Sequence, residues 1–205
     1  MFALVILAGC ATKQLLPDWQ TDAKGALDAS VDDYLKGHTA AALADFRSAR
    51  SATTATGRAD YVAQVELVRC AVQVASLDFD DCPGYAALAQ EATPEQRAYA
   101  DYLYGRWQGL SASLLPEQHR PVLASGQLAG VTDPLARLVA AGASFKAGRI
   151  TPDGIAQAIE TASKQGWRRP LLAWLQVQLH RAEAADDTQA IQRLRRRIAL
   201  ISGQA

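Results

Sequence analysis

The chain has 205 residues, enough for one domain with a substantial hydrophobic core or for a short array of repeats. It is 49% hydrophobic and carries 21 basic and 21 acidic side chains, and a chain balanced in this way has no overall field to attract nucleic acid. The three histidines, His38, His119 and His180, lie far apart without the spacing of metal ligands. The sequence therefore predicts neither a metal site nor a cofactor.

An unbroken apolar run, residues 2–9, ends at Cys10. The run is far too short to span a bilayer, which takes about 20 apolar residues, and it is typical of the end of a signal peptide. The segment Leu7-Ala8-Gly9-Cys10 resembles the lipobox of bacterial lipoproteins, in which an aliphatic residue and two small residues precede a cysteine. This resemblance implies that Cys10 carries a diacylglycerol lipid and begins the mature protein.

The residues after Cys10 favour an outer-membrane location. In enteric bacteria an aspartate at this point retains lipoproteins at the inner membrane, whereas Ala11 and Thr12 follow the cysteine here. We therefore expect a lipid anchor in the outer membrane, with the body of the protein facing the periplasm. The expected regions are a signal-peptide remnant, a lipidated cysteine with its tether, and a helical domain, at residues 1–9, 10–22 and 23–205 respectively.

Two further cysteines, Cys70 and Cys82, lie in the body of the chain. Export would place them in an oxidising compartment, where two remaining cysteines most simply pair. A bond between them would clamp the end of one predicted helix to the start of the next. The alternative is a pair of buried thiols.

The body of the chain reads as helix throughout. Alanine and leucine are abundant, β-branched and aromatic residues are sparse, and no segment has the alternation of a strand. Helix starts are marked by Thr93-Pro94, Asp133-Pro134 and Thr151-Pro152, where proline follows a capping residue. We predict ten helices in five antiparallel pairs: 23–36 with 40–52, 59–77 with 84–91, 95–108 with 117–129, 134–147 with 152–165, and 170–184 with 187–202.

The first pair resembles a tetratricopeptide repeat. The family's spacing of an aromatic residue, a turn glycine, and then alanine, aromatic and alanine is matched by Tyr34, Gly37, Ala42, Phe46 and Ala49. The last pair matches less fully. The resemblance implies an all-α fold of helix pairs stacked as a short α-solenoid, and the alternative is a non-repeating helical bundle.

In tetratricopeptide proteins the first helix of each pair lines a groove that holds a partner segment. By this resemblance the partner-binding residues would be Lys24, Leu27, Val31, Tyr34 and Leu35. Leu27, Val31 and Tyr34 follow helical spacing, which also fits a helix face buried in the core.

A cluster of aromatic residues, Tyr99, Tyr102, Tyr104 and Trp107, cannot all lie on one face of a helix. These residues therefore either pack in the core and between helices or form an exposed binding surface.

No catalytic constellation is recognisable, because the sequence lacks a nucleophile motif, a phosphate-binding loop and paired carboxylates. We therefore predict a non-enzymatic periplasmic lipoprotein that acts as a protein-binding adaptor or scaffold in envelope or secretion-machine assembly. The alternatives are a peptidoglycan-acting envelope enzyme and a carrier of an apolar ligand. The expected partners are the membrane, through the lipid, and a periplasmic protein.

Overall fold

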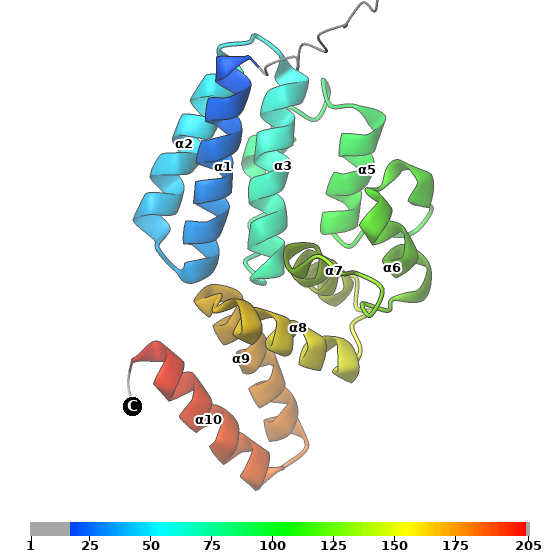
Figure 1. The fold of residues 1–205 in the computed structure, drawn as a ribbon. Helices are drawn as coiled ribbons and strands as arrows, with labels where there is room; N and C mark the ends of the chain where they lie inside the picture. Colours follow the sequence, from blue (N-terminus) through cyan, green and yellow to red (C-terminus); the bar gives the residue numbers. More distant parts are fainter. Residues whose placement is uncertain (1–16, 204–205) are drawn as a thin grey trace, which may run out of the picture.

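The computed structural model describes residues 17–203, and every regular element within this range is helical (Figure 1). The elements are α1 (Asp18–Lys36), α2 (Thr39–Thr54), α3 (Ala59–Ala75), α4 (Pro83–Ala86), α5 (Pro94–Leu103), η1 (Ala112–Leu114), η2 (Glu117–His119), α6 (Arg120–Ser125), α7 (Pro134–Lys146), α8 (Pro152–Gln165), α9 (Arg168–Ala184) and α10 (Thr188–Ser202). The prediction of an all-α fold is confirmed. Cys10 and the apolar run before it lie outside the described residues.

Local capping chemistry determines several helix starts. Thr93 accepts a hydrogen bond from the backbone of Gln96, whose side chain bonds back to the Thr93 backbone, so α5 begins with a full capping box. Asp133 and Thr151 cap α7 and α8 in the same position before a proline. These three starts agree with the sequence prediction.

Other boundaries differ from the prediction. Helix α1 begins at Asp18, so residues 18–22, which we expected to belong to the tether, are helical. The helix expected at 84–91 is only the single turn α4, after which the chain continues in turns.

The helix expected at 117–129 is also shorter. Its place is taken by η2 and α6, and α6 ends at Ser125 because Gly126 adopts a left-handed conformation, with φ of 71°. Helix α5 stops at Leu103, ahead of Gly105, whose φ is 74°. Both glycines lie inside a predicted helix but act as the residues that end it.

The first pair forms the hairpin that its sequence predicts. Gly37 ends α1 with φ of 95°, and its backbone N–H bonds to the last carbonyls of the helix. Ala42, Phe46 and Ala49 are buried on α2. The small alanines allow α1 and α2 to approach closely, and Phe46 fills the space between helices.

The helices do not continue as a linear stack. Helices α1, α2 and α3 lie side by side, and α8, α9 and α10 lie beyond one end of this layer (Figure 1). Helix α3 packs against α7, and α1 against the start of α9, so the first and last predicted pairs are in contact. In a linear solenoid each repeat contacts only its neighbours; this arrangement is closer to the alternative, a non-repeating bundle.

Two polar contacts join the last helices to the first. The indole Nε1–H of the fully buried Trp174 on α9 donates to the carbonyl oxygen of Ala75, at 3.1 Å. Arg169 donates from Nε to the carbonyl oxygen of Tyr34 at 2.8 Å, and from its guanidinium to the Thr39 hydroxyl at 2.6 Å. Helix α9 therefore docks on the carboxyl ends of both α1 and α3.

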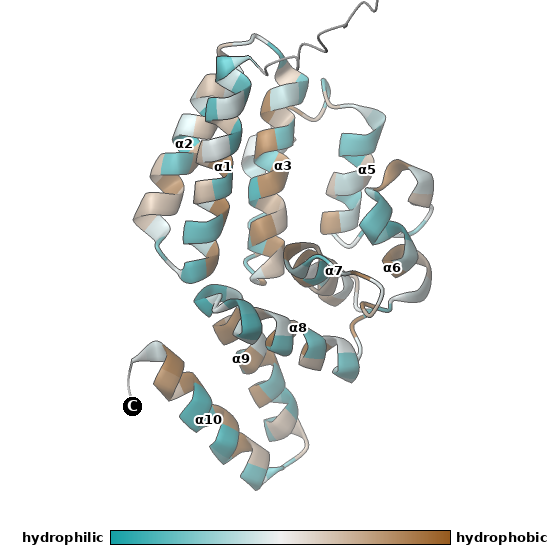
Figure 2. Ribbon diagram, viewed as in Figure 1, coloured by the Kyte–Doolittle hydropathy of each residue, from teal (hydrophilic) through white to brown (hydrophobic). Residues whose placement is uncertain are grey.

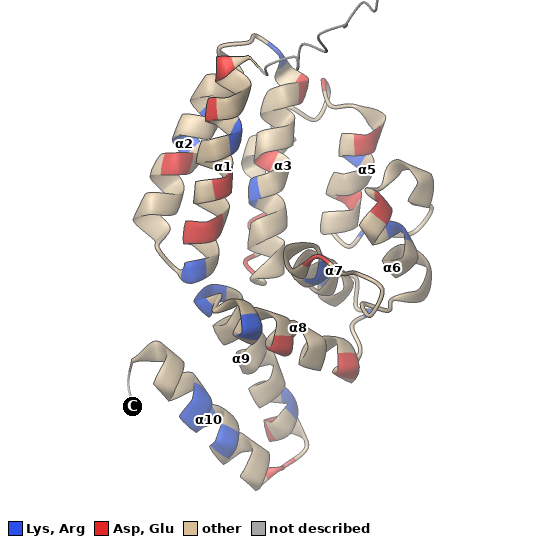
Figure 3. Ribbon diagram, viewed as in Figure 1, with Lys and Arg blue, Asp and Glu red and all other residues tan. Residues whose placement is uncertain are grey.

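The surface helices are amphipathic. Apolar and hydrophilic residues alternate along α9 and α10 in Figure 2, as expected for helices with one face in water. Acidic and basic residues are spread over the molecule, with basic residues gathered on α10 (Figure 3). Between residues 17 and 203, no helix is long and apolar enough to cross a bilayer.

The predicted disulfide is present. Cys70 near the end of α3 is bonded to Cys82 just before α4, with the two Cα atoms 5.6 Å apart. Both residues are buried, and the bond closes the loop that contains Phe79. Phe79 stacks on Phe145 of α7, so this loop also contributes to the packing between distant segments.

Candidate functional site

A cavity of about 240 Å³ lies between α1, α2 and α3, and we call it the α1–α3 cavity. Its walls are mostly apolar, and its polar residues come from α1, the start of α2, α3, the loop after α3 and the start of α9. It is lined by Leu27, Ser30, Val31, Tyr34, Thr39, Ala42, Leu43, Phe46, Arg69, Val72, Gln73, Asp78 and Arg169.

Three of the five residues predicted to face a groove line this cavity: Leu27, Val31 and Tyr34. The other two do not. Lys24 is exposed and pairs with Asp28 one turn further along the same helix. Leu35 is only 1% exposed and lies in the interior, where a partner cannot reach it.

Tyr34 is held by contacts on both sides. Its hydroxyl donates to Oδ2 of Asp78 at 2.8 Å, and the guanidinium of Arg169 lies 4.2 Å from the ring centre. Burial raises the pKa of the Tyr34 phenol, and the hydrogen bond to Asp78 raises it further, so the group stays protonated. Tyr34 is therefore both a wall of the cavity and a junction between α1, the loop after α3, and α9.

Two arginines give the cavity a basic side. Arg169 is already bonded to the backbone and side chains of the α1–α2 turn. Arg69 lies over the Phe46 ring, with 4.9 Å between its guanidinium carbon and the ring centre. No ion pair holds Arg69 within residues 17–203. Its charge is consequently available to an acidic group that enters the cavity.

The mouth of the cavity carries an exposed apolar side chain. Leu43 on α2 is 40% exposed, one of two large apolar residues in the described part of the chain with such exposure. An apolar side chain at the rim of an apolar cavity is a common feature of recognition sites.

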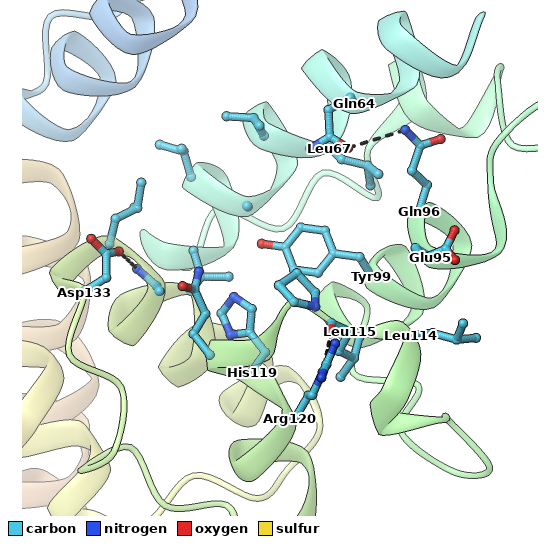
Figure 4. Close-up of a pocket in the computed structure, with 18 of the residues that line it drawn as sticks. Gln64, Leu67, Glu95, Gln96, Tyr99, Leu114, Leu115, His119, Arg120 and Asp133 are labelled. Carbon is cyan, nitrogen blue, oxygen red and sulfur yellow. Dashed lines mark hydrogen bonds between the residues drawn. The ribbon is translucent and has the colours of Figure 1, made fainter. Parts of the chain in front are cut away.

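A second cavity, of about 450 Å³, lies between α3, α5, the η1–η2 segment and the start of α7 (Figure 4). We call it the α3–α7 cavity. Tyr99 extends into it from α5, with the ring of the buried His119 beside it (Figure 4). No local pattern in the sequence indicates that these two residues meet.

The four residues of the aromatic cluster do not all have the same role: some pack in the core and others lie nearer the surface. Tyr102 and Trp107 are core residues that stack with their ring centres 5.1 Å apart. Tyr104 lies nearer the surface and donates to the Asp81 carbonyl at 3.2 Å. Of the four aromatic residues, Tyr99 lines the α3–α7 cavity.

Glu66, the buried acidic residue of α3, makes structural contacts. Glu66 is 4% exposed and pairs with Nε of Arg50 at 2.7 Å. Its carboxylate also packs directly on Gly84, where an added Cβ would overlap it. Over residues 17–203, no three metal-binding side chains come together.

Comparison of the chain with protein-family models, curated proteins and solved structures finds no match. The function must therefore be inferred from the cavities and their side chains.

Proposed function

We propose that this protein is a membrane-tethered, non-enzymatic adaptor of the bacterial cell envelope, and that it binds a segment of a partner protein in the α1–α3 cavity. The observation that carries the proposal is the meeting of Leu27, Val31 and Tyr34 around an apolar cavity with a cation in its wall, Arg69, that no acidic side chain of residues 17–203 neutralises. The tether is supported by the lipobox resemblance at Leu7-Ala8-Gly9-Cys10.

The lining defines the chemistry of the partner segment. Val31, Phe46 and Val72 offer an apolar surface, and the volume of about 240 Å³ suits one large apolar side chain. Leu43 at the rim would cover the neighbouring part of the segment. Arg69 would pair with an acidic residue next to the apolar one. We therefore expect an apolar anchor with an adjacent aspartate or glutamate.

The cavity is also suited to recognition because its walls are fixed before a partner arrives. Tyr34 is bonded to Asp78 and stacked against Arg169, and Ser30 donates to the Ala42 carbonyl at 2.8 Å. Side chains that are already ordered lose little entropy on binding, so more of the contact energy appears as affinity.

Site-specific photocrosslinking in living cells tests this proposal. A photoreactive benzoylphenylalanine in place of Leu43 should yield a discrete adduct with one envelope protein. The same group in place of Gln192, which is exposed on α10, is the matched control and should not yield that adduct. Combining Val31→Trp with the photoreactive group at position 43 should fill the cavity and remove the adduct. An adduct of equal yield from Gln192, or one that survives Val31→Trp, would exclude the α1–α3 cavity as the binding site.

A further inference from the structure

The α3–α7 cavity has the dimensions of a small-molecule site. Its volume of about 450 Å³ falls within the range of roughly 300–1,000 Å³ that is usual for such sites. Leu67 and Ala71 of α3 and Leu135 and Val139 of α7 supply apolar walls from opposite sides. These residues are far apart in the chain, so the cavity is formed by the packing of α3 against α7 rather than by one flexible loop.

The cavity contains a buried polar side chain without a partner. His119 is 1% exposed, and its Nδ1 atom has no hydrogen-bond partner among the described residues. Its neighbours are the Tyr99 and Tyr102 rings, with centres 5.6 Å and 5.0 Å from the imidazole. A buried nitrogen left without a hydrogen bond costs free energy, and such atoms in native proteins usually bond to a water or a ligand.

His119 is uncharged at neutral pH. Burial lowers its pKa from 6.5 to about 4, although the carboxylate of Asp133 acts in the opposite direction. A neutral imidazole has one nitrogen that accepts a hydrogen bond and one N–H that donates. The His119 side chain can therefore form a hydrogen bond with either a donor or an acceptor group of a ligand.

A second polar group lies beside the first. Tyr99 reaches from α5 across the cavity toward the region of His119 (Figure 4). Burial is the one influence that raises the pKa of its phenol, with no hydrogen bond contributing within residues 17–203. The Tyr99 and His119 rings lie side by side with centres 5.6 Å apart, which puts both side chains within reach of one polar group on a ligand.

The charged residues at the edge of the cavity are already engaged. Asp133 accepts from the Ala136 backbone N–H at 2.7 Å as the cap of α7. Arg120 donates from Nε to the Leu115 carbonyl at 2.9 Å. Glu95 is exposed in the first turn of α5. These bonds hold the Asp133 and Arg120 side chains at the edge of the cavity, while its walls are mainly apolar, and this favours an uncharged ligand over an ionic one.

We propose that the α3–α7 cavity binds an uncharged, mostly apolar molecule that carries one hydroxyl, amine or carbonyl group, held by Tyr99 and His119. The two cavities share one lining residue, Val72 of α3, and this proposal does not depend on the proposed adaptor function. Leu67 and Val139 contact the apolar body of the ligand, while the two polar side chains orient its single polar group.

The fluorescent probe N-phenyl-1-naphthylamine tests the proposal. It is uncharged, has two apolar ring systems and one N–H donor, and its emission rises in an apolar site. The full 205-residue chain with Cys10→Ala is used, so that no detergent is needed to keep a lipidated protein in solution. Thermal unfolding of every variant verifies that it is folded before titration.

Variants of the two cavities distinguish the sites. Val68→Trp places an indole in the α3–α7 cavity, and Leu43→Trp places one in the α1–α3 cavity. We expect saturable binding of one probe per chain, lost by at least about tenfold in Val68→Trp and unchanged in Leu43→Trp. Tyr99→Phe removes a single hydroxyl, and His119→Phe removes the ring nitrogens while keeping an aromatic ring. Each should weaken binding by about threefold to tenfold, the effect of one hydrogen bond.

Three results would overturn the proposal. The first is the absence of saturable binding to the folded chain, which would mean that the cavity holds water alone. The second is binding that Val68→Trp leaves intact, which would place the probe elsewhere. The third is binding that neither Tyr99→Phe nor His119→Phe changes, which would mean that the two polar side chains do not hold the ligand.

Discussion

Gly142 of α7 lies directly against the backbone of Val74 of α3. A Cβ added to Gly142 would stand 2.0 Å from the Val74 carbonyl oxygen, so the two helices approach more closely here than any side chain permits. This contact sets the spacing between α3 and α7, and thereby the walls of the α3–α7 cavity.

Gly142→Ala should therefore destabilise the protein. The added methyl group has to push backbone rather than a flexible side chain, and overpacking of this kind typically costs about 1–3 kcal/mol. Gly25→Ala is the matched control, because Gly25 lies within α1 and no described residue comes within 4 Å of its added Cβ. That change should stabilise the helix by about 0.5–1 kcal/mol. Urea unfolding of both variants measures the difference, and equal free energies of unfolding would contradict the close contact.

The Cys70–Cys82 disulfide should stabilise the fold. Its sequence separation is 12 residues, and closing a loop of that length is worth about 3 kcal/mol in the chain-entropy model. The double variant Cys70→Ala with Cys82→Ala should lose about that much free energy of unfolding. Thiol counting on denatured, non-reduced protein taken directly from cells should find neither cysteine titratable. Two titratable thiols there would show that the bond does not form in the cell.

His119 should make the stability depend on pH. Its pKa is lowered from 6.5 to about 4 in the folded protein. Between these values the unfolded chain takes up a proton that the folded protein does not. Well above pH 6.5 the buried imidazole therefore costs no stability. As the pH falls toward 4, protonation of the unfolded chain lowers the free energy of unfolding by roughly 3 kcal/mol.

Comparison of pH profiles isolates this contribution from that of the carboxylates. The free energy of unfolding of the wild type should fall more steeply than that of His119→Phe between about pH 7 and about pH 4.5. His180→Gln, which changes an exposed histidine on α9, is the matched control. Parallel profiles for the wild type and His119→Phe would mean that the imidazole is not desolvated.

Lipidation at Cys10 remains a prediction from the sequence. Metabolic labelling with palmitate should mark the wild type but not Cys10→Ala, and the variant should leave the membrane fraction. Labelling of both proteins to the same extent would show that Cys10 is not the lipid anchor.

The sequence predicted those parts of the fold that local chemistry determines. Thr93 and Asp133 start helices with side-chain caps, and Gly37 ends α1, because each of these effects involves only neighbouring residues. The disulfide could also be predicted, since export would leave Cys70 and Cys82 as a pair.

The segment around α4 and the arrangement of the helices were not predictable in this way. Leu77, Asp81 and Cys82 adopt positive φ values of 57°, 56° and 48° in the loop that the disulfide closes. Non-glycine residues rarely take such values, and tertiary contacts maintain them here. Periodicity indicates which face of α3 is apolar but not that α7, rather than the next helix, covers it.

The same limit applies to the candidate sites. Leu27, Val31 and Tyr34 line the α1–α3 cavity, but the tetratricopeptide resemblance could not separate them from the buried Leu35. Tyr99 and His119 meet only because α5 and η2 fold against each other, and no spacing in the sequence records that contact.

If Arg69 and its apolar surroundings recognise a partner segment, the yield of the photoadduct from position 43 should depend on Arg69 and not on a neighbouring exposed arginine. Arg69→Gln removes a cation of the α1–α3 cavity, whereas Arg47→Gln removes an exposed cation of α2 that does not line the cavity. Loss of a charge-assisted hydrogen bond should reduce the adduct by about tenfold in Arg69→Gln. Arg47→Gln should give the wild-type yield. Equal yields from both variants would contradict recognition by this cavity.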